Sequence, residues 1–352
     1  MLDLLAIRKV LADLFDVRPR DVSAHRQAGH PEALVSVSGF HLLIAWLRTS
    51  EPGRLWVEWP RIQERARALG SAALPLVVVP FMGSSGRVCC QEKGIAWVDL
   101  CGNARVVGEG LRLLVTGQAN RFARPGRPRT AFAPRSARVV RVLLEEPHRF
   151  VSQRELSKIS GLNEGSTSRV VKRLEEDGYL VRSSDGKVRP RNTDLLLDAW
   201  DHEYQFPRHQ VIHGYAPSPS GANLMNKIVG VLESNSVDHA ATGLASAWLW
   251  GVEEVSDFRL VTLYVREQPS SEILDVLQTQ LELSFQDNDA AANVWLVIPN
   301  DDGVFLGASV RDGVRTVHPV QVYLDLAAHP ENASAAREHI RSRHLIRVTT
   351  ED

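Results

Sequence analysis

A short run of hydroxyl and basic residues near the middle of the chain has the composition of a surface that binds phosphates and base edges. The run consists of Ser166, Ser168, Arg169, Lys172 and Arg173. Short hydroxyls near the N-terminus of a helix let the backbone approach a phosphate, and arginines one turn later reach guanine or phosphate oxygens. This chemistry requires a helix that exposes these side chains and buries its opposite face.

The surrounding residues predict such a helix over about 164–177. Asn163 is a typical N-cap residue. Thr167, Val171 and Leu174 recur at i, i+4 and i+7, so one face of the helix is directed toward a core. The hydroxyl and basic side chains are thereby directed outward.

Two further helices are predicted before this one. Residues 136–146 have an apolar face and are followed by a proline, which stops a helix. Ser152 and the glutamate three residues later have the spacing of a capping box, which opens a short helix that ends at Gly161. Leu156 and Ile159 are expected to be the buried residues of this helix.

A hairpin is predicted directly after the three helices. Gly178 has the position of a helix C′ residue, and the Asp185-Gly186 pair is typical of a tight turn between two strands. The basic residues of the hairpin are expected to contact flanking DNA backbone. They are Arg182, Lys187 and Arg189, together with Arg191 directly after the hairpin. Three helices followed by such a hairpin predict a winged helix-turn-helix over 136–192.

The segment before these helices is rich in arginine and contains no acidic residue between Glu109 and Glu145. Its arginines are Arg112, Arg121, Arg124, Arg127, Arg129, Arg135, Arg138 and Arg141. Such a run is typical of a patch that neutralises phosphates. Within 121–135, the Gly-Arg-Pro core around Arg127 resembles minor-groove hooks, and Arg124, Arg127 and Arg129 are candidate DNA contacts. A solvated basic linker is the alternative interpretation.

Residues 1–120 are predicted to form an α/β domain, with a helix that begins at Pro60. Their order of elements resembles the restriction-endonuclease-like fold, in which carboxylates and a lysine hold a catalytic metal. Residues 42–46 occupy the equivalent strand and contain neither, so we expect a degenerate domain without a metal site. Asp99 is either a ligand or the acceptor of a β-turn, and the turn is the favoured interpretation.

Residues 193–352 are predicted to form a second α/β domain. The turn at 242–246 before a strand resembles the nucleotidyltransferase arrangement, in which a Gly-Ser turn precedes paired acids. The strand at 260–264 lacks those acids, so we expect a degenerate domain that does not transfer nucleotides. The whole chain is therefore expected to be a multidomain α/β protein that is not an enzyme and holds no metal or other cofactor.

Composition agrees with this organisation. The chain has 352 residues, of which 44% are hydrophobic, which is ample for several cores. The formal net charge of −1 hides an asymmetry, because arginines gather in the middle and acids in the C-terminal third. Cys89, Cys90 and Cys101 lack zinc spacing, and no apolar run is long enough to span a membrane. A cytoplasmic protein without a membrane partner is expected.

Several segments together resemble the AbiEi-like type IV antitoxin regulators. The winged helix ends in Leu195-Leu196-Leu197-Asp198-Ala199-Trp200 with Tyr204, and 242–246, 261–265 and 318–326 follow in the same order. The resemblance implies a DNA-binding repressor that autoregulates an operon, often beside a nucleotidyltransferase-like toxin. The long α/β domain before the winged helix is a departure from the smaller antitoxins.

These observations favour a sequence-specific transcription regulator that binds double-stranded DNA. One winged helix covers only about half a turn of duplex, so a homodimer on a two-fold site is expected. Two alternatives are a protein-binding adaptor or antitoxin that acts without DNA, and a metal-dependent nuclease.

Overall fold

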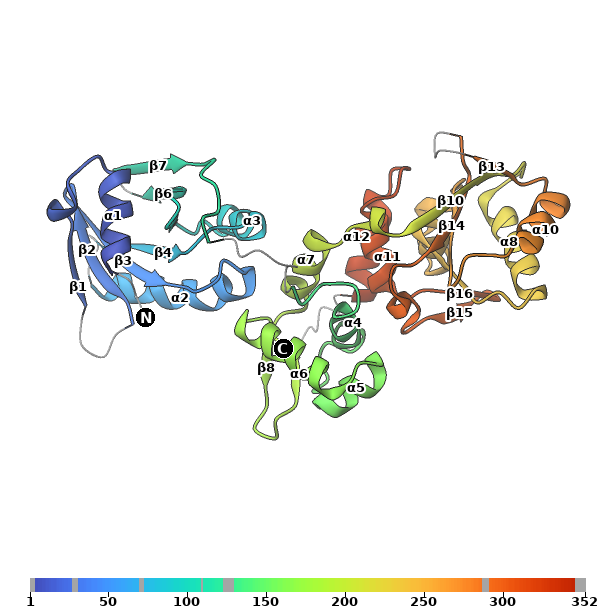
Figure 1. Ribbon diagram of the computed structural model, residues 1–352, viewed down its shortest axis with the longest axis horizontal. Coiled ribbons are helices and arrows are strands. Elements are labelled where there is room, and N and C mark those ends of the chain that lie inside the picture. Colours follow the sequence, from blue (N-terminus) through green and yellow to red (C-terminus); the bar gives the residue numbers. More distant parts are fainter. Residues whose placement is uncertain are drawn as a thin grey trace. The chain divides into compact units, whose positions relative to one another are not determined.

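The computed structural model of the protein describes residues 4–26, 31–69, 73–108, 110–122, 130–286 and 291–345 (Figure 1). The chain divides into two compact units. One is formed by residues 1–129 and 172–181, and the other by residues 130–171 and 182–352. No helix of the described residues is long and apolar enough to cross a membrane.

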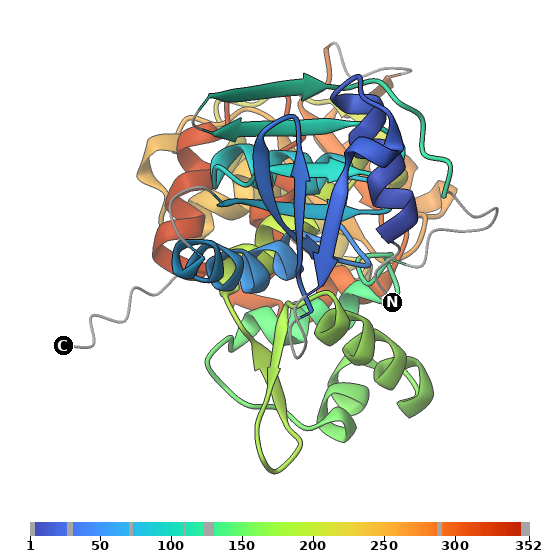
Figure 2. The same cartoon turned by 90° about the vertical axis from the view of Figure 1, so that its left-hand side faces the viewer.

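The first unit contains a seven-stranded sheet in which the strands follow one another in sequence order. Its elements are α1 (Leu4–Leu14), η1 (Pro19–Asp21), β1 (Ser23–Arg26), β2 (Ala33–Val37), β3 (Phe40–Trp46), α2 (Pro52–Ala68), β4 (Ala73–Val79), α3 (Ser84–Glu92), β5 (Trp97–Asp99), β6 (Ala104–Gly108) and β7 (Leu111–Val115). Strands β3, β4 and β5 are parallel and the outer pairs are antiparallel. In Figure 2, β6 and β7 are seen at the top of this sheet.

Helix α2 is longer than the sequence predicts. It begins at Pro52 and continues through Pro60, whereas the sequence predicts a helix that begins at Pro60. Proline inside a helix removes one backbone hydrogen bond. The helix continues because Leu55, Trp59 and Ile62 form one buried stripe on both sides of Pro60, and the burial of these large side chains outweighs the lost bond.

Asp99 at the end of β5 is the centre of a closed hydrogen-bonded turn. Its Oδ1 accepts from the backbone N–H groups of Cys101 and Asn103, both at 2.9 Å. Its Oδ2 accepts from Met82 N at 3.1 Å and from Asn103 Nδ2 at 2.9 Å. The side chain is fully buried. The interpretation as a turn acceptor is therefore confirmed.

The three cysteines are free and buried. Burial raises the pKa of Cys89 to about 11, and burial also raises the pKa of Cys90. Both thiols are therefore protonated at neutral pH and serve as packing groups.

The middle of the chain contains the helices and hairpin predicted from the sequence. They are α4 (Ala137–Glu145), α5 (Gln153–Ser160), α6 (Glu164–Glu176), β8 (Leu180–Arg182) and β9 (Val188–Pro190), followed by α7 (Thr193–Glu203). The two strands form a separate sheet, and the hairpin lies at the bottom of Figure 2.

Helix α4 is buried on almost all sides. Seven of its nine residues are buried, including Arg141. An amphipathic surface helix buries one stripe only. Arg138 and Arg141 contact residues far along the chain, Asp301 and Gln321 respectively. Helix α4 therefore belongs both to the predicted DNA-binding region and to the core of the C-terminal region.

The C-terminal region is built on a second seven-stranded sheet, in the order β13-β10-β14-β12-β11-β16-β15. Its elements are η2 (Phe206–Arg208), β10 (Gln210–Tyr215), α8 (Gly221–Ser234), β11 (His239–Thr242), α9 (Gly243–Leu249), η3 (Glu253–Val255), β12 (Val261–Val265), α10 (Ser271–Leu281), β13 (Ser284–Gln286), β14 (Val294–Ile298), η4 (Asp302–Phe305), β15 (Ser309–Arg311), β16 (Val314–Thr316), α11 (Pro319–Leu326), α12 (Ser334–Ile340) and η5 (Arg341–Leu345). Figure 1 shows α8 and α10 on one side of the sheet and α11 and α12 on the other.

A buried polar network lies in the core of this region. The carboxylate of Asp325 accepts hydrogen bonds from Tyr204, Tyr264 and Gln321 on Oδ1 and from Thr242 on Oδ2. Burial raises the pKa of Asp325 to about 6, against the opposing effect of these four donors. The network joins α7, β11, β12 and α11, and Gln321 extends it to Arg141 on α4.

Candidate nucleic-acid interface

The turn between α5 and α6 forms through local capping. The Oγ of Ser152 accepts from Glu155 N at 3.2 Å and opens α5. Gly161 ends α5 at φ +67°, a left-handed conformation that glycine adopts without strain. Leu156 is buried as predicted, whereas Ile159 is 38% exposed. The prediction that Ile159 is buried was wrong, because this short helix directs only its Leu156 side toward the core.

Helix α6 begins and is oriented as the sequence predicts. The Oδ1 of Asn163 accepts from Ser166 N at 2.8 Å. Thr167, Val171 and Leu174 are each fully buried, which confirms the predicted inner face. On the outer face, Ser166 is half-buried and the other four predicted residues are exposed. These are Ser168, Arg169, Lys172 and Arg173.

Arg169 lies along the surface of α6 toward its N-terminus. Its Nε donates to Gly165 O and its Nη2 donates to Ser166 Oγ, both at 3.1 Å. Both partners are neutral, so the positive charge of the guanidinium is retained. Two neutral, exposed hydrogen bonds are readily exchanged for charge-assisted bonds to a phosphate or a base.

Lys172 and Arg173 have acidic partners one turn later on the same helix. The Nζ of Lys172 is 4.0 Å from Glu176, and the Nε of Arg173 is 2.6 Å from Asp177 Oδ2. Asp177 is buried, which holds Arg173 near the C-terminal end of α6. Sequence reasoning assigned both cations to DNA without considering these i, i+4 pairs, although their spacing is visible in the sequence.

The hairpin brings three further predicted cations to the surface or near it. Gly186 has φ +85°, as the turn requires. Arg182 donates to Gly186 O at 2.6 Å, and Lys187 Nζ is 2.8 Å from Asp185 Oδ2. The guanidinium of Arg189 lies 4.8 Å from the ring centroid of Phe150, so Arg189 is less exposed than Arg182 and Lys187.

The arginine-rich segment does not form one solvated patch. Arg124, Arg127 and Arg129 lie outside the described residues. Of the others, Arg138 pairs with Asp301 and Arg141 is buried, so both belong to the core side of α4. The interpretation of these two as phosphate-neutralising residues was wrong, because Arg141 is buried with the apolar residues of α4 and Asp301 neutralises Arg138.

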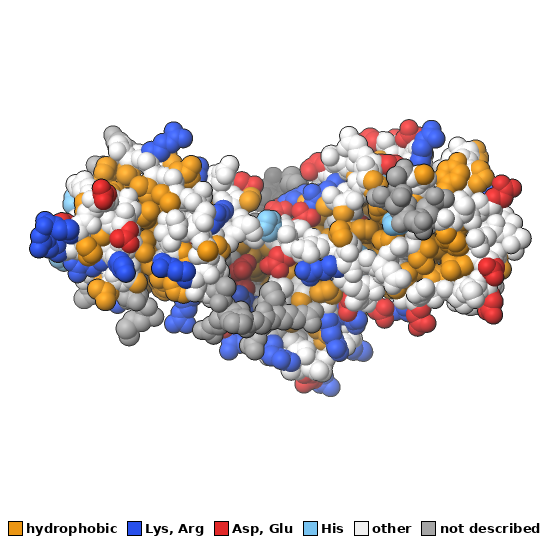
Figure 3. Space-filling model, turned by 45° about the horizontal axis from the view of Figure 1, so that its top comes forward, with side chains coloured by type: hydrophobic (Ala, Val, Ile, Leu, Met, Phe, Trp, Pro, Cys, Tyr) orange, Lys and Arg blue, Asp and Glu red, His pale blue; other side chains and the backbone are white. Residues whose placement is uncertain are grey.

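The distribution of charge agrees with the predicted asymmetry. Figure 3 shows Lys and Arg side chains around the winged-helix elements at the bottom of the view, and many Asp and Glu side chains on the C-terminal region at its right. Among the described residues, no group of three or more His, Cys, Asp or Glu is placed to hold a metal ion.

Comparisons with known proteins identify one part of the chain. Neither the curated proteins nor the solved structures gave a significant match. Residues 132–189 match the model of the MarR family. This range begins before α4 and ends within β9, so it covers the three helices and most of the hairpin. Residues 132–189 are therefore similar to the winged helix-turn-helix of the MarR family, which indicates a DNA-binding transcriptional regulator.

Proposed function

We propose that this protein is a sequence-specific transcriptional regulator that reads double-stranded DNA with α6. The observation that carries the proposal is the match of residues 132–189 to the MarR family, over a region whose third helix exposes Ser168 and Arg169. A recognition helix enters the major groove with residues of its N-terminal half against base edges. Arg169 has the charge and the position to read guanine.

We propose that the remaining predicted residues contact the sugar-phosphate backbone of the DNA. Arg182 on the hairpin is an exposed cation suited to flanking phosphates. Lys172, Arg173 and Lys187 contribute less, because each has an acidic neighbour. Arg124, Arg127 and Arg129 remain proposed minor-groove contacts of the linker, on the basis of their sequence alone.

We further propose that the protein binds an inverted repeat as a homodimer. A single winged helix contacts a short half-site, and bacterial regulators usually reach useful affinity with two modules on a two-fold site. Sedimentation velocity at micromolar concentration tests this. A monomer that binds a single half-site one-to-one would contradict it.

We propose that the protein is a regulator and not an enzyme. The support is local: the four hydrogen bonds that Asp99 accepts leave its carboxylate engaged in a turn. The residues on β3, FHLLIAW, contain no carboxylate, and neither do those on β12, VTLYV.

A narrower role, autorepression in an AbiEi-like antitoxin operon, is proposed on the resemblance of segments in the C-terminal region. It predicts a gene for a nucleotidyltransferase-like toxin beside the gene for this protein. The match to the MarR family does not extend to this narrower assignment. Co-purification with the product of the neighbouring gene would test it directly.

The main experiment measures binding to the DNA upstream of the protein's own gene. Fluorescence anisotropy is recorded on this duplex and on a scrambled duplex, across a salt series, with and without magnesium. The logarithm of affinity should fall linearly with the logarithm of salt concentration, with a slope of about −0.9 for each phosphate neutralised. Equal affinity for both duplexes would contradict sequence-specific recognition. No binding at low salt would favour the adaptor, and magnesium-dependent cleavage would favour the nuclease.

A further inference from the structure

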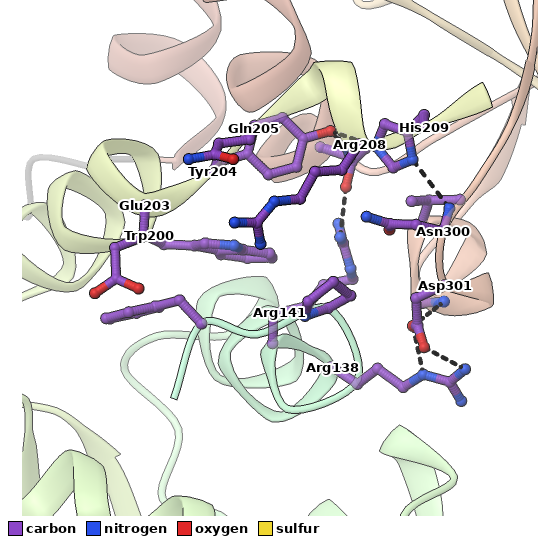
Figure 4. A pocket seen from close by; sticks show the side chains of 16 residues that line it. Arg138, Arg141, Trp200, Glu203, Tyr204, Gln205, Arg208, His209, Asn300 and Asp301 are labelled. Atoms are coloured by element: carbon purple, nitrogen blue, oxygen red, sulfur yellow. Dashed lines mark hydrogen bonds and ion pairs between the residues drawn. The ribbon is translucent and has the colours of Figure 1, made fainter. Parts of the chain in front are cut away.

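A cavity of about 40 Å³ lies inside the second unit, beside α4 (Figure 4). Its lining comes from α4, α7, η2 and the turn after β14, and includes Arg141, Trp200, Arg208, His209 and Asn300. A single buried water needs roughly 10 to 15 Å³ by this measure. The cavity therefore has room for a few waters or for one small polyatomic group.

Arg141 is a buried cation with unused donors at this cavity. Its side chain is almost fully buried, and Nη2 donates to Gln321 Oε1. Its Nε and Nη1 have no hydrogen-bond partner among the described residues. Burying a guanidinium group costs free energy when no protein acceptors replace its hydrogen bonds to water. The ring of Trp200, 5.0 Å from the guanidinium carbon, offsets only part of this cost.

No carboxylate in the described part of the chain forms an ion pair with Arg141. Asp325 acts on it only through space, since its oxygens accept from Tyr204, Tyr264, Gln321 and Thr242. Glu145 also acts through space, and burial raises the pKa of its own carboxyl group.

The other groups at the cavity do not neutralise Arg141 either. Burial lowers the pKa of His209 to about 4, so its ring is neutral at pH 7. Its two ring nitrogens are engaged by Tyr204 and by the N–H of Asn300. Glu203 points away from Arg141 in Figure 4. Arg138 is neutralised by Asp301.

A second cation stands at the edge of the cavity. Arg208 is exposed, and Figure 4 shows its side chain extending over the cavity toward Trp200. The cavity thus combines one buried guanidinium that has open donors with one exposed guanidinium at its edge. Arginine clusters of this kind bind carboxylates and phosphates through charge-assisted hydrogen bonds.

We propose that this cavity binds a small oxyanion, the carboxylate or phosphate group of a metabolite, through Nε and Nη1 of Arg141. Arg208 closes over the bound group from the solvent side. The anion supplies the charge and the acceptors that the protein does not provide to Arg141. Because Arg141 belongs to α4 and Arg208 to η2, a bound anion also ties the first helix of the winged helix to η2.

The test measures thermal unfolding of the full-length protein without DNA, at pH 7 and constant ionic strength. Sodium chloride is replaced stepwise by sodium acetate or by sodium phosphate. At ten times its dissociation constant, a bound anion should raise Tm by roughly 2 to 4 °C. A shift with acetate alone identifies a carboxylate site, and a shift with phosphate alone identifies a phosphate site.

Variants separate binding from general salt stabilisation. Arg141→Gln should abolish the anion-dependent shift, and Arg208→Gln should weaken the apparent affinity roughly 3- to 10-fold. Arg259→Gln is the matched control, since Arg259 is an exposed arginine away from the cavity, and it should retain the wild-type shift. If Arg141→Gln does not fold, Arg208→Gln decides, because its side chain is exposed.

Two results would overturn the proposal. One is a wild-type protein with the same Tm in chloride, acetate and phosphate. The other is a shift that Arg141→Gln or Arg208→Gln retains in full, which would indicate general salt stabilisation. The assay contains no DNA, so its outcome is independent of the proposed regulatory function.

Discussion

Arg138 and Asp301 form a two-point ion pair between residues 163 positions apart. The Nε of Arg138 is 2.7 Å from Oδ1 of Asp301, and its Nη2 is 3.0 Å from Oδ2. Both side chains are largely removed from solvent. The hydrogen bonds to Asp301 raise the pKa of Arg138 above its usual value. The pair joins α4 to the turn before η4.

Replacing Arg138 with methionine should lower the free energy of unfolding by about 1 to 3 kcal/mol, because it leaves Asp301 without its charged partner. Methionine keeps most of the apolar stem, so packing changes little. Urea denaturation measures the effect, and Arg259→Met is the exposed control. A double-mutant cycle with Asp301→Asn isolates the pair. A coupling energy below about 0.5 kcal/mol would show that the pair contributes little.

Arg169→Ala should weaken binding to the specific DNA site by about 1 to 3 kcal/mol and relax its sequence preference. Arg173→Ala should have a smaller effect, since the ion pair with Asp177 already engages Arg173. Fluorescence anisotropy on specific and scrambled duplexes measures both, with Arg259→Ala as control. Wild-type affinity for Arg169→Ala would show that α6 is not the reading helix.

Asp99→Ala should lower the free energy of unfolding by about 2 to 4 kcal/mol, because it leaves buried N–H donors of Met82, Cys101 and Asn103 without an acceptor. Circular dichroism during urea denaturation measures this. No magnesium-dependent nicking is expected from the wild-type protein on any duplex. Nicking that persists through purification and disappears in Asp99→Ala would mean that Asp99 holds a metal.

The protein should lose stability as the pH falls from about 6.5 to 4. Burial lowers the pKa of His209 and His329 to about 4 and that of His318 to about 3. In the unfolded chain these groups take up protons near pH 6.5, so unfolding binds protons in this window. Asp325 and Asp177 act in the opposite direction, because burial raises their pKa values to about 6 and about 7 and so adds stability at low pH that is lost as the pH rises. Burial also raises the pKa of Glu145 and lowers that of His344. The downward shifts of the histidines together exceed the upward shifts of these carboxyl groups, so we expect the loss of stability to dominate.

Urea denaturation at pH 7, 6 and 5 measures this dependence. His329→Asn should make the decline shallower, because asparagine keeps an acceptor near the position of Nδ1, which accepts from Glu331 N at 3.3 Å, and does not titrate. The slope with pH is compared, not the absolute stability, since the smaller side chain also alters packing. An unchanged slope in His329→Asn would contradict the assignment of His329 as a buried neutral group.

The winged-helix elements were predictable because their signals are local. Ser152, Asn163 and Gly161 cap helices within a few residues of their own positions, and the buried stripe of α6 is read from a single period of 3.6 residues. The same local reasoning placed the start of α2 at Pro60, because a proline is a strong local signal and tertiary burial of Leu55 and Trp59 is not visible from neighbours in sequence.

The cavity beside α4 was not predictable from the sequence. Arg141 was read as one more cation of a basic segment, whereas its partner Gln321 lies 180 positions away. The pairing depends on how α4 packs in the C-terminal region, and no local pattern carries that information. Arg124, Arg127 and Arg129 remain predictions, since they lie outside the described residues.

The burial of α4 has a consequence for how the protein folds during its synthesis. The helix emerges from the ribosome long before Asp301 and Gln321, which pair with its two arginines. Until those residues are synthesised, α4 exposes its apolar side chains to water. Arg141, which is buried in the complete protein, is exposed as well and has no partner yet. We therefore expect that residues 132–189 do not fold as an autonomous module. An excised 130–192 fragment should be far less protected from proteolysis than the same residues in the whole protein.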